Sequence, residues 1–479
     1  MNKKIATYII TAGVLLTGAG CKKFLDVNSD PAGAEKVNNN LLLTGVETRT
    51  AFAITGGYPA RTAMFWTQQL AYNQPAPEWD TYKSTASDVE NTWAFDMYPG
   101  NLMNLKILEG QAHTDGNNHF EGIAKVMLAY ELAVTTDLWN DIPYSEGFKG
   151  FGNLTPKYDS QESIYKTISV LLDSSIILMT NPDKSISQPD AKDLIYGTAP
   201  NDQMDSWIKF ANLLKARYAL RLVYAPGHTV AAQAQAALAA VANSFPDASY
   251  NAGLTFGTAA GNEAPWYQFI NTWGSVMMSS TMIDRLKASN DPRLPVFATT
   301  NANGEYVGRV IGADQDAAAN ISGVGDLWSS DATGKSQTVY FGTYDELLFI
   351  KAEATYLTTG FAAAQPILID AVKAAMKRFG LDPNSAAVTT YITAHCTLTA
   401  ANAYETIMTE KYLANFLSLE AYNDWRRTNL PKLTVVQNAY QGITTIPRRF
   451  LYPASENETN KQPQQPGKLT DRVWWDTKQ

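Results

Sequence analysis

The chain has 479 residues, of which 45% are hydrophobic and 18% are charged, and its formal net charge is −8. This apolar share is large enough for a folded core and excludes a wholly disordered chain. The negative charge argues against a nucleic-acid-binding protein, which usually has a basic face. Two cysteines in the whole chain exclude a disulfide scaffold and a multi-cysteine metal site.

The first twenty residues predict a secretory signal peptide. Lys3 and Lys4 are followed by an apolar run at residues 5–16 and by small residues that lead to Cys21. The run is shorter than the roughly 20 residues that span a bilayer. Cleavage before Cys21 would expose a thiol that bacteria acylate, so the segment resembles a lipoprotein signal. The alternative is an ordinary secreted protein in which this cysteine occurs by chance.

The short polar residues at 21–40 predict a tether between a lipidated Cys21 and the folded part of the chain. No later stretch approaches 18 consecutive apolar residues, so the lipid is predicted to be the only membrane anchor. Lipidation would leave Cys396 without a disulfide partner. Cys396 is therefore predicted to be a lone buried thiol.

Apolar residues at helical spacing predict a mostly α fold. The stripes lie at residues 123–134, 164–178, 207–222, 347–357, 368–379 and 403–427. The fourth and fifth are joined by a short turn that contains Gly360 and Pro366, and this unit resembles a tetratricopeptide repeat. Such helix pairs stack and bury their apolar faces against one another. We expect a single domain at 41–479, in which tetratricopeptide-like helix pairs form a scaffold capped by long irregular loops with minor β structure.

Three long segments, near 74–100, 243–275 and 291–340, are predicted to be irregular insertions. They are rich in Gly, Pro, Asn and aromatic residues. Irregular segments of this length in a compact domain are usually functional or disordered, and their aromatic content argues against disorder. We expect them to form a binding face on the helical scaffold.

Seven sequence blocks carry a resemblance to a known family, and they occur in order along the chain. They are Cys21–Asp26 (CKKFLD), Thr136–Glu146, Trp207–Arg217, Asp291–Leu294 (DPRL), Glu346–Glu353, Trp425–Thr428 (WRRT) and Ile446–Pro453. Together they resemble the SusD/RagB family of nutrient-binding outer-membrane lipoproteins, and the later blocks resemble its SusD-like 2 branch.

The resemblance implies a tetratricopeptide-like scaffold anchored to the outer membrane and facing outward. It implies capture of an oligosaccharide and its delivery to a SusC-like TonB-dependent barrel, which the protein covers like a lid. A peptide ligand taken up by the same kind of system is the alternative. No nucleic-acid partner is expected.

Loop aromatics with polar neighbours are the candidate ligand contacts, because a ring can bury the apolar C–H face of a sugar while nearby polar groups bind its hydroxyls. Trp79 and Trp328 are the first choices, since each has a carboxylate neighbour. The same surface could take peptide side chains, and the alternative role for these rings is to pin long loops to the scaffold. The predicted ligand-binding set is Trp79, Tyr82, Trp93, Trp266, Tyr306, Arg309, Asp326 and Trp328, and Tyr267, Trp273, Glu78, Asp80, Asn271 and Lys335 complete the group of loop aromatics and polar neighbours.

The sequence predicts a binding protein rather than an enzyme, with no catalytic residue, no metal ligand and no cofactor other than the acyl anchor. His113 and His119 have no metal-ligand spacing and are predicted to be solvated loop histidines. The serine-nucleophile and phosphate-binding glycine motifs are absent. A secreted glycan hydrolase remains the alternative, because spacing alone cannot pair two carboxylates among 46 acidic residues.

Residues 314–326 begin like a calcium-binding loop. Asp314, Asp316, Asn320 and Asp326 could supply oxygen ligands, but Ala318 stands at the fifth place and the sixth place has no glycine. Calcium is therefore a weakly supported alternative.

Two pairs of adjacent arginines stand out in this acidic chain. They are Arg426 with Arg427 and Arg448 with Arg449. We expect them to hold the C-terminal segment to the body through buried carboxylates.

Overall fold

The computed structural model describes residues 36–183, 185–460, 462 and 467–478. The described residues from Asn39 onward form one compact unit. The predicted signal peptide and Cys21 lie outside the described residues, and so does most of the predicted tether.

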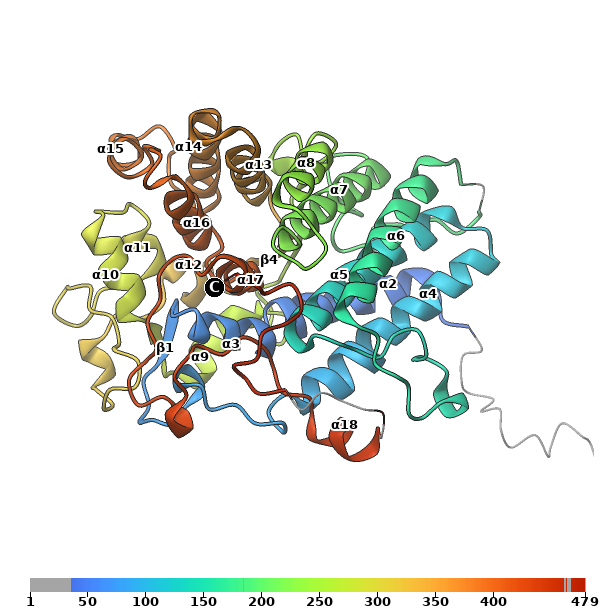
Figure 1. Ribbon diagram of the computed structural model, residues 1–479, viewed down its shortest axis with the longest axis horizontal. Helices are drawn as coiled ribbons and strands as arrows, with labels where there is room; N and C mark the ends of the chain where they lie inside the picture. The colour runs from blue at the N-terminus through green and yellow to red at the C-terminus, as the bar shows by residue number, and fades with distance from the viewer. Residues whose placement is uncertain (1–35, 184, 461, 463–466, 479) are drawn as a thin grey trace, which may run out of the picture. The chain divides into compact units, whose positions relative to one another are not determined.

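Helices dominate the unit from Asn39 onward, as the sequence predicts (Figure 1). The strands are β1 Leu70–Tyr72, which pairs antiparallel with β3 Val276–Met278, and β2 Ala252–Thr255, which pairs antiparallel with β4 Thr338–Gly342. The α-helices are α2 Asn39–Arg49, α3 Tyr58–Trp66, α4 Met103–Thr114, α5 Asn118–Trp139, α6 Gln161–Thr180, α7 Gln203–Arg221, α8 Val230–Val241, α9 Pro265–Trp273, α10 Ser280–Ala288, α11 Leu294–Phe297, α12 Asp326–Ser329, α13 Tyr344–Thr359, α14 Phe361–Arg378, α15 Ala386–His395, α16 Ala403–Ala414, α17 Leu419–Thr428 and α18 Ala454–Thr459.

The remaining helical turns among the described residues are of two other kinds. Two are π-helices, η2 Thr50–Thr55 and η4 Thr92–Leu102. The 3₁₀ turns are η3 Trp79–Thr81, η5 Gly150–Gly152, η6 Ala248–Tyr250, η7 Ala318–Asn320 and η8 Tyr440–Gly442.

The predicted stacking of helix pairs is confirmed. Contacts run from α4 to α5, α6, α7, α8, α13, α14 and α16 in turn, and Figure 1 shows these helices as a row. Side-chain N-caps fix where several of them begin: Asn117 accepts the N–H of Phe120 at α5, and Ser160 accepts that of Ser163 at α6. Each helix in the row therefore buries its apolar stripe against its neighbours.

Among the described helices, α6 is long and apolar enough to cross a membrane by length and composition. It packs against α5 and α7 in the row, and residues such as Ile164 and Ile168 are buried there. A core helix of a globular protein passes the same test, and these contacts make α6 part of the scaffold.

Two of the predicted helix boundaries are wrong. Pro366 does not belong to the turn between α13 and α14 but lies inside α14. The turn is Gly360 alone, whose φ of 96° favours a residue without a Cβ. The predicted helix at 403–427 is two helices, because the chain breaks at Leu417, where φ is 63°, and Ser418 then caps α17.

The three segments predicted as irregular contain short helices, so that expectation is wrong for those parts, while the rest of the segments is irregular. Residues 74–100 overlap η4, residues 243–275 include α9, and residues 291–340 include α11 and α12. At α9 the residues at the two helix ends explain the error. Pro265 occupies the first helical position, and Gly274 ends the helix in the left-handed conformation. Both residues also favour loops, so composition alone pointed to the wrong state.

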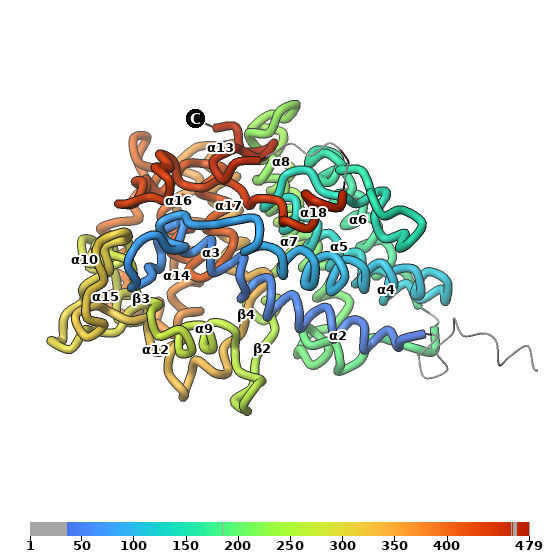
Figure 2. The backbone as a smooth tube through the Cα atoms, turned by 90° about the horizontal axis from the view of Figure 1, so that it is seen from below, coloured from blue at the N-terminus to red at the C-terminus, as the bar shows by residue number. Residues whose placement is uncertain are grey.

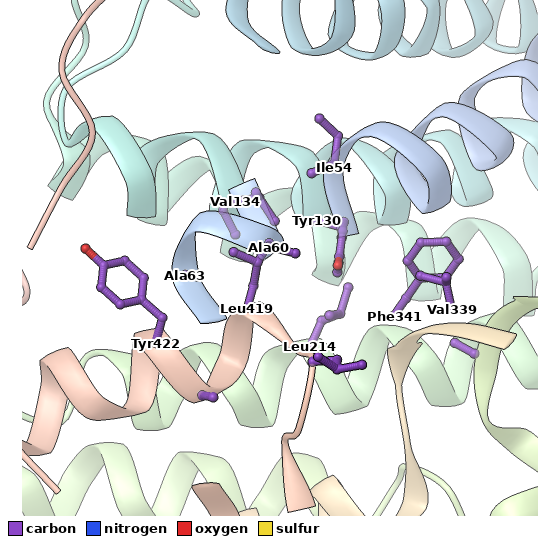
Figure 3. Close-up of a cluster of buried hydrophobic side chains, with 14 of the residues drawn as sticks. Ile54, Ala60, Ala63, Tyr130, Val134, Leu214, Val339, Phe341, Leu419 and Tyr422 are labelled. Carbon is purple, nitrogen blue, oxygen red and sulfur yellow. The ribbon is translucent and has the colours of Figure 1, made fainter. Parts of the chain in front are cut away.

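The core lies where η2, α5, α7, α17 and β4 meet (Figure 3). Ile54 of η2, Leu214 of α7 and Leu419 of α17 point into it. The rings of Tyr130 on α5 and Phe341 on β4 meet edge to face at 5.7 Å. Burying each large apolar side chain contributes about 1.5–3 kcal/mol, so this cluster fixes β4 against the helical row.

A buried carboxyl joins the two π-helices to α5. Thr50 Oγ1 of η2 donates to Glu131 Oε1 at 2.5 Å, and Asn101 Nδ2 of η4 donates to the same oxygen at 2.8 Å. Burial raises the pKa of Glu131 to about 7, and the two donors only partly offset it. Glu131 therefore links three elements and changes its charge near neutral pH.

The two arginine pairs do hold the C-terminal segment, although only one arginine of each pair does so through carboxylates. Arg448 binds Asp476 with Nε at 2.5 Å and Nη2 at 2.9 Å, and Arg427 binds Glu353. Arg426 instead donates to the carbonyl of Asp137, and Arg449 to that of Trp139. The prediction is confirmed for Arg427 and Arg448 and wrong in its chemistry for the other two.

Cys396 is a free cysteine and is fully buried at the end of α15. Burial raises the pKa of its thiol well above the usual value. The predicted lone buried thiol is therefore confirmed.

Candidate functional site

Three partly exposed rings from different elements meet beside the β1–β3 sheet, and we call Tyr72, Trp79 and Trp273 the aromatic shelf. The ring centroids of Trp79 and Trp273 are 5.4 Å apart. Tyr72 lies 6.4 Å from Trp79, with the two ring planes within 19° of parallel, and 6.4 Å from Trp273. Trp273 ends α9 with 48% of its surface exposed. The rings therefore form one aromatic cluster at the surface, in which Trp273 is the most exposed member.

The shelf rests on a second layer of buried rings. Phe269, one turn before Trp273 on α9, stacks on Trp79 with a centroid distance of 6.4 Å and an interplanar angle of 11°. Tyr58 of α3 meets the edge of Trp79 at 5.5 Å. A short capping box, in which Glu78 and Thr81 bond each other's backbone, fixes the turn η3 that carries Trp79. These contacts set the orientation of Trp79.

Asp80 fixes Tyr72 relative to Trp79. Its Oδ2 accepts the backbone N–H of Tyr72 at 2.7 Å, so the end of β1 is held against η3. Burial raises the pKa of Asp80 to about 6, although that hydrogen bond and the charge of Arg309 act in the opposite direction. Asp80 thus supports the shelf from below rather than facing a ligand.

The segments that carry the shelf also carry polar side chains. Gln74 Nε2 donates to Ser275 Oγ at 2.9 Å, which connects the loop after β1 to the residue after Gly274. Asn271 is exposed on α9, and its Nδ2 donates to the carbonyls of Tyr267 and Ser329. Figure 2 shows α9 beside α12, the helix that contains Ser329. Stacked rings with amides and hydroxyls at their edge can bury an apolar face and hydrogen-bond the groups around it.

Of the predicted ligand contacts, Trp79 is part of the shelf, and two others are buried in the body. Tyr82 is fully buried, and its hydroxyl accepts the N–H of Val436 at 3.2 Å. Trp93 is 4% exposed and packs against Trp139 with a centroid distance of 5.2 Å. These two rings pin their segments to the body, which is the alternative role stated for the loop aromatics.

Trp266 and Trp328 are also buried, and both line a pocket of about 110 Å³. Trp328 is 8% exposed and packs between Phe297, Phe379 and Phe416, at centroid distances of 5.8, 6.1 and 5.0 Å. These contacts give its ring the environment of a core residue, unlike that of Trp79.

The remaining predicted contacts lie in the segment 291–340. Arg309 is buried, and its guanidinium donates to the carbonyls of Val310 and Ala313. Tyr306 is half-buried, and Asp326 is exposed at the start of α12. Arg309 therefore shapes the loop that follows it instead of offering its charge to solvent.

Sequence reasoning missed Tyr72 and named Trp273 only as an additional loop aromatic. Tyr72 was unmarked because its strand is three residues long. Trp273 had one local signal: it directly precedes Gly274, a residue typical of a helix end, which indicates that the ring lies at the end of a helix.

The described residues contain no group of three or more His, Cys, Asp or Glu side chains that could hold a metal. Asp316 Oδ1 accepts Asn320 Nδ2 at 2.9 Å, so two of the suggested calcium ligands pair with each other. His113 and His119 lie on α4 and α5 rather than in a loop, which corrects their prediction.

Comparisons with known proteins agree with this architecture. The family model SusD-like 2, described as "Starch-binding associating with outer membrane", matches residues 31–453. A chitin-binding protein of known structure has a TM-score of 0.76 at 24% identity and covers 92% of this chain and 100% of its own. A SusD/RagB family protein from Bacteroides thetaiotaomicron has a TM-score of 0.75 at 24% identity, covering 92% of this chain and 99% of its own.

A chitin-binding SusD homolog from Flavobacterium johnsoniae has a TM-score of 0.69 at 21% identity and covers 92% of this chain and 98% of its own. At these identities the likeness establishes the fold. No curated protein matches. Because the family model matches most of the chain, this protein belongs to the SusD-like 2 family of outer-membrane-associated binding proteins.

Proposed function

We propose that this protein is a surface lipoprotein that captures an oligosaccharide on the aromatic shelf and delivers it to a SusC-like TonB-dependent transporter. The observation that carries the proposal is the shelf, where Trp79 and Trp273 lie 5.4 Å apart with one of them half-exposed. The family description as starch-binding and the chitin-binding relatives of the same fold support a glycan as ligand.

The binding step would be non-covalent. A sugar ring would place its C–H face on Trp273 and Trp79, while Gln74 and Ser275 would supply hydrogen bonds to its hydroxyls. Aromatic side chains supply contact area at low entropic cost, and a rigid second layer reduces the cost of ordering them. The ligand would leave the shelf unchanged, and the transporter would supply the energy for uptake.

Retention at the outer membrane would come from acylation of Cys21. Each buried CH₂ of an acyl chain contributes about 0.8 kcal/mol, so two or more chains hold a protein stably. In full-length protein expressed in its own type of host, labelled palmitate should be incorporated, and Cys21→Ser should abolish it. Co-purification of a barrel protein with the tagged lipoprotein in mild detergent would support delivery, whereas isolation of the lipoprotein alone would contradict it.

Calorimetry with maltooligosaccharides, chitin oligosaccharides and mixed peptides tests the ligand class. We expect one of the glycan series to bind, and we expect Trp273→Ala to weaken it at least tenfold. Phe151→Ala is a matched control, because Phe151 is an aromatic residue with 98% of its surface exposed outside the shelf. Binding of peptides alone would replace the glycan with the alternative ligand. Release of reducing sugars from bound glycan would indicate the hydrolase instead.

A further inference from the structure

A groove of about 300 Å³ opens between three loops near the shelf. Its walls are residues 75–77, which connect β1 to η3, residues 312–314, and residues 438–441 of the C-terminal segment. We call it the side groove. None of its residues belongs to the shelf, and none was among the predicted ligand contacts.

The side groove lies close to the shelf. Pro77 in the groove and Trp79 in the shelf are two residues apart, so their Cα atoms lie at most about 7 Å from each other. Asn73, which follows Tyr72, donates its Nδ2 to the carbonyl of Asp316 at 2.8 Å. This bond ties the end of β1 to the loop that forms the second wall. Figure 1 shows the C-terminal segment running past β1, and Gln68 before β1 binds the carbonyl of Thr434.

The walls of the side groove are held by specific contacts. Asn438 Nδ2 donates to the carbonyl of Gly312 at 2.8 Å, joining the second wall to the third. Gly312 has φ of 79°, and a Cβ there would lie 1.9 Å from the carbonyl oxygen of Gln437. The buried guanidinium of Arg309 donates to Val310 at 3.0 Å and to Ala313 at 2.7 Å. The groove is therefore a built feature rather than a gap between loose loops.

The side groove offers one aromatic ring and polar side chains. Tyr440 is half-buried, and its hydroxyl accepts Gln441 Nε2 at 3.3 Å. Asp314 and Gln441 are exposed and can bind hydroxyl groups. A phenol ring with a carboxylate and an amide beside it suits a sugar ring for the reason that the shelf does.

We propose that the side groove is a second sugar-binding subsite, so that the ligand is an extended glycan chain with one part on the shelf and the next part in the groove. The proposal rests on the proposed function and adds to it the length of the ligand. Two weak sites joined by one chain bind more tightly than either alone, because the second contact becomes intramolecular. Affinity should therefore rise with chain length until both subsites are filled.

The test is calorimetry of the mature chain with the disaccharide through the hexasaccharide of the glycan series that binds. For wild type we expect the hexasaccharide to bind at least tenfold more tightly than the disaccharide. Tyr440→Ala should remove most of that gain, whereas Tyr440→Phe should keep it. Phe151→Ala is the matched exposed-aromatic control, and melting curves of all variants establish that they are folded.

The outcomes separate the two proposals. If Trp273→Ala weakens binding but Tyr440→Ala leaves the dependence on chain length intact, the side groove is not a subsite and the shelf stands. If Tyr440→Ala weakens short and long chains equally, the subsite is likewise overturned, since the groove then does not extend the shelf. If neither glycan series binds wild type, the proposed function fails and the side groove fails with it.

Discussion

Arg427 and Glu353 form a two-pronged ion pair in the interior, with Nη1 to Oε1 at 2.6 Å and Nη2 to Oε2 at 2.8 Å. Arg427 lies on α17 and Glu353 on α13, so the pair joins the C-terminal part of the body to the helical row. Burial acts to raise the pKa of Glu353, but the charges of Arg427 and Lys411 outweigh it, and the pKa lies below the usual value. The carboxylate is therefore ionised and paired.

Replacing one partner of this pair should destabilise the protein strongly. Glu353→Gln leaves the Arg427 guanidinium buried without a full counter-charge, which typically costs about 3–5 kcal/mol. Urea unfolding at pH 7 measures the change. Glu162→Gln, in the exposed pair with Lys166, is the control and should leave the unfolding midpoint where it is. Equal midpoints for wild type and Glu353→Gln would show that the interior pair adds no net stability.

The buried Glu131 should make stability depend on pH near neutrality. Its pKa is about 7 in the folded state, above the ordinary 4.5, so the folded protein keeps a proton that the unfolded chain releases between these values. Stability is therefore highest below pH 4.5 with respect to this group and falls as pH rises through 7, by about 3 kcal/mol. Glu131→Gln cannot titrate at this position. The free energies of unfolding of wild type and variant, measured from pH 5 to 8, should therefore approach each other as the pH falls. A constant difference between variant and wild type across this range would contradict the assignment.

Trp328 and Trp273 should respond differently to truncation. Trp328 packs among three buried phenylalanines, so Trp328→Ala should cost about 3–5 kcal/mol of stability. Trp273 is half-exposed, so Trp273→Ala should change the melting temperature little and lower glycan affinity at least tenfold, which corresponds to about 1.4 kcal/mol. Thermal melts and calorimetry on both variants decide this. If the Trp328→Ala variant is as stable as wild type but no longer binds glycan, Trp328 belongs to the binding site after all.

Trp79 and Trp328 mark how far sequence can predict the site. Each has an acidic neighbour in a segment rich in loop residues, and local pattern gives them the same role. What separates them is distant in sequence: Trp328 meets Phe416 of the turn before α17, whereas Trp79 meets Trp273 at the end of a helix. Ring partners nearly a hundred or more positions away leave no trace in local spacing.

The scaffold was more predictable than the site for a physical reason. Apolar stripes such as that of α5 depend on residues three or four positions apart, which the sequence displays directly. The sequence blocks that resemble the SusD/RagB family then implied the same helical scaffold. The shelf depends on β1, a strand of three residues, and on where Gly274 stops α9, and neither is marked by periodicity.

Cys396 should be inert in the folded protein. Its thiol is fully buried and burial raises its pKa, so little thiolate forms and reagents cannot reach it. In a variant that lacks Cys21, a disulfide-exchange reagent should modify Cys396 at least a hundredfold more slowly in buffer than in guanidinium chloride. Rapid modification in buffer would mean that α15 opens readily.

The close contact at Gly312 limits which substitutions the two loops can accept. Because the loop at 312 touches the backbone of Gln437 where even a methyl group has no room, neither loop can be remodelled while the other stays as it is. A side chain at position 312 would require the backbone at Gln437 to move, so a substitution of Gly312 would need a compensating change in the other loop. Among related sequences, we therefore expect the loop at Gly312 and the loop at Gln437 to change together rather than one position at a time.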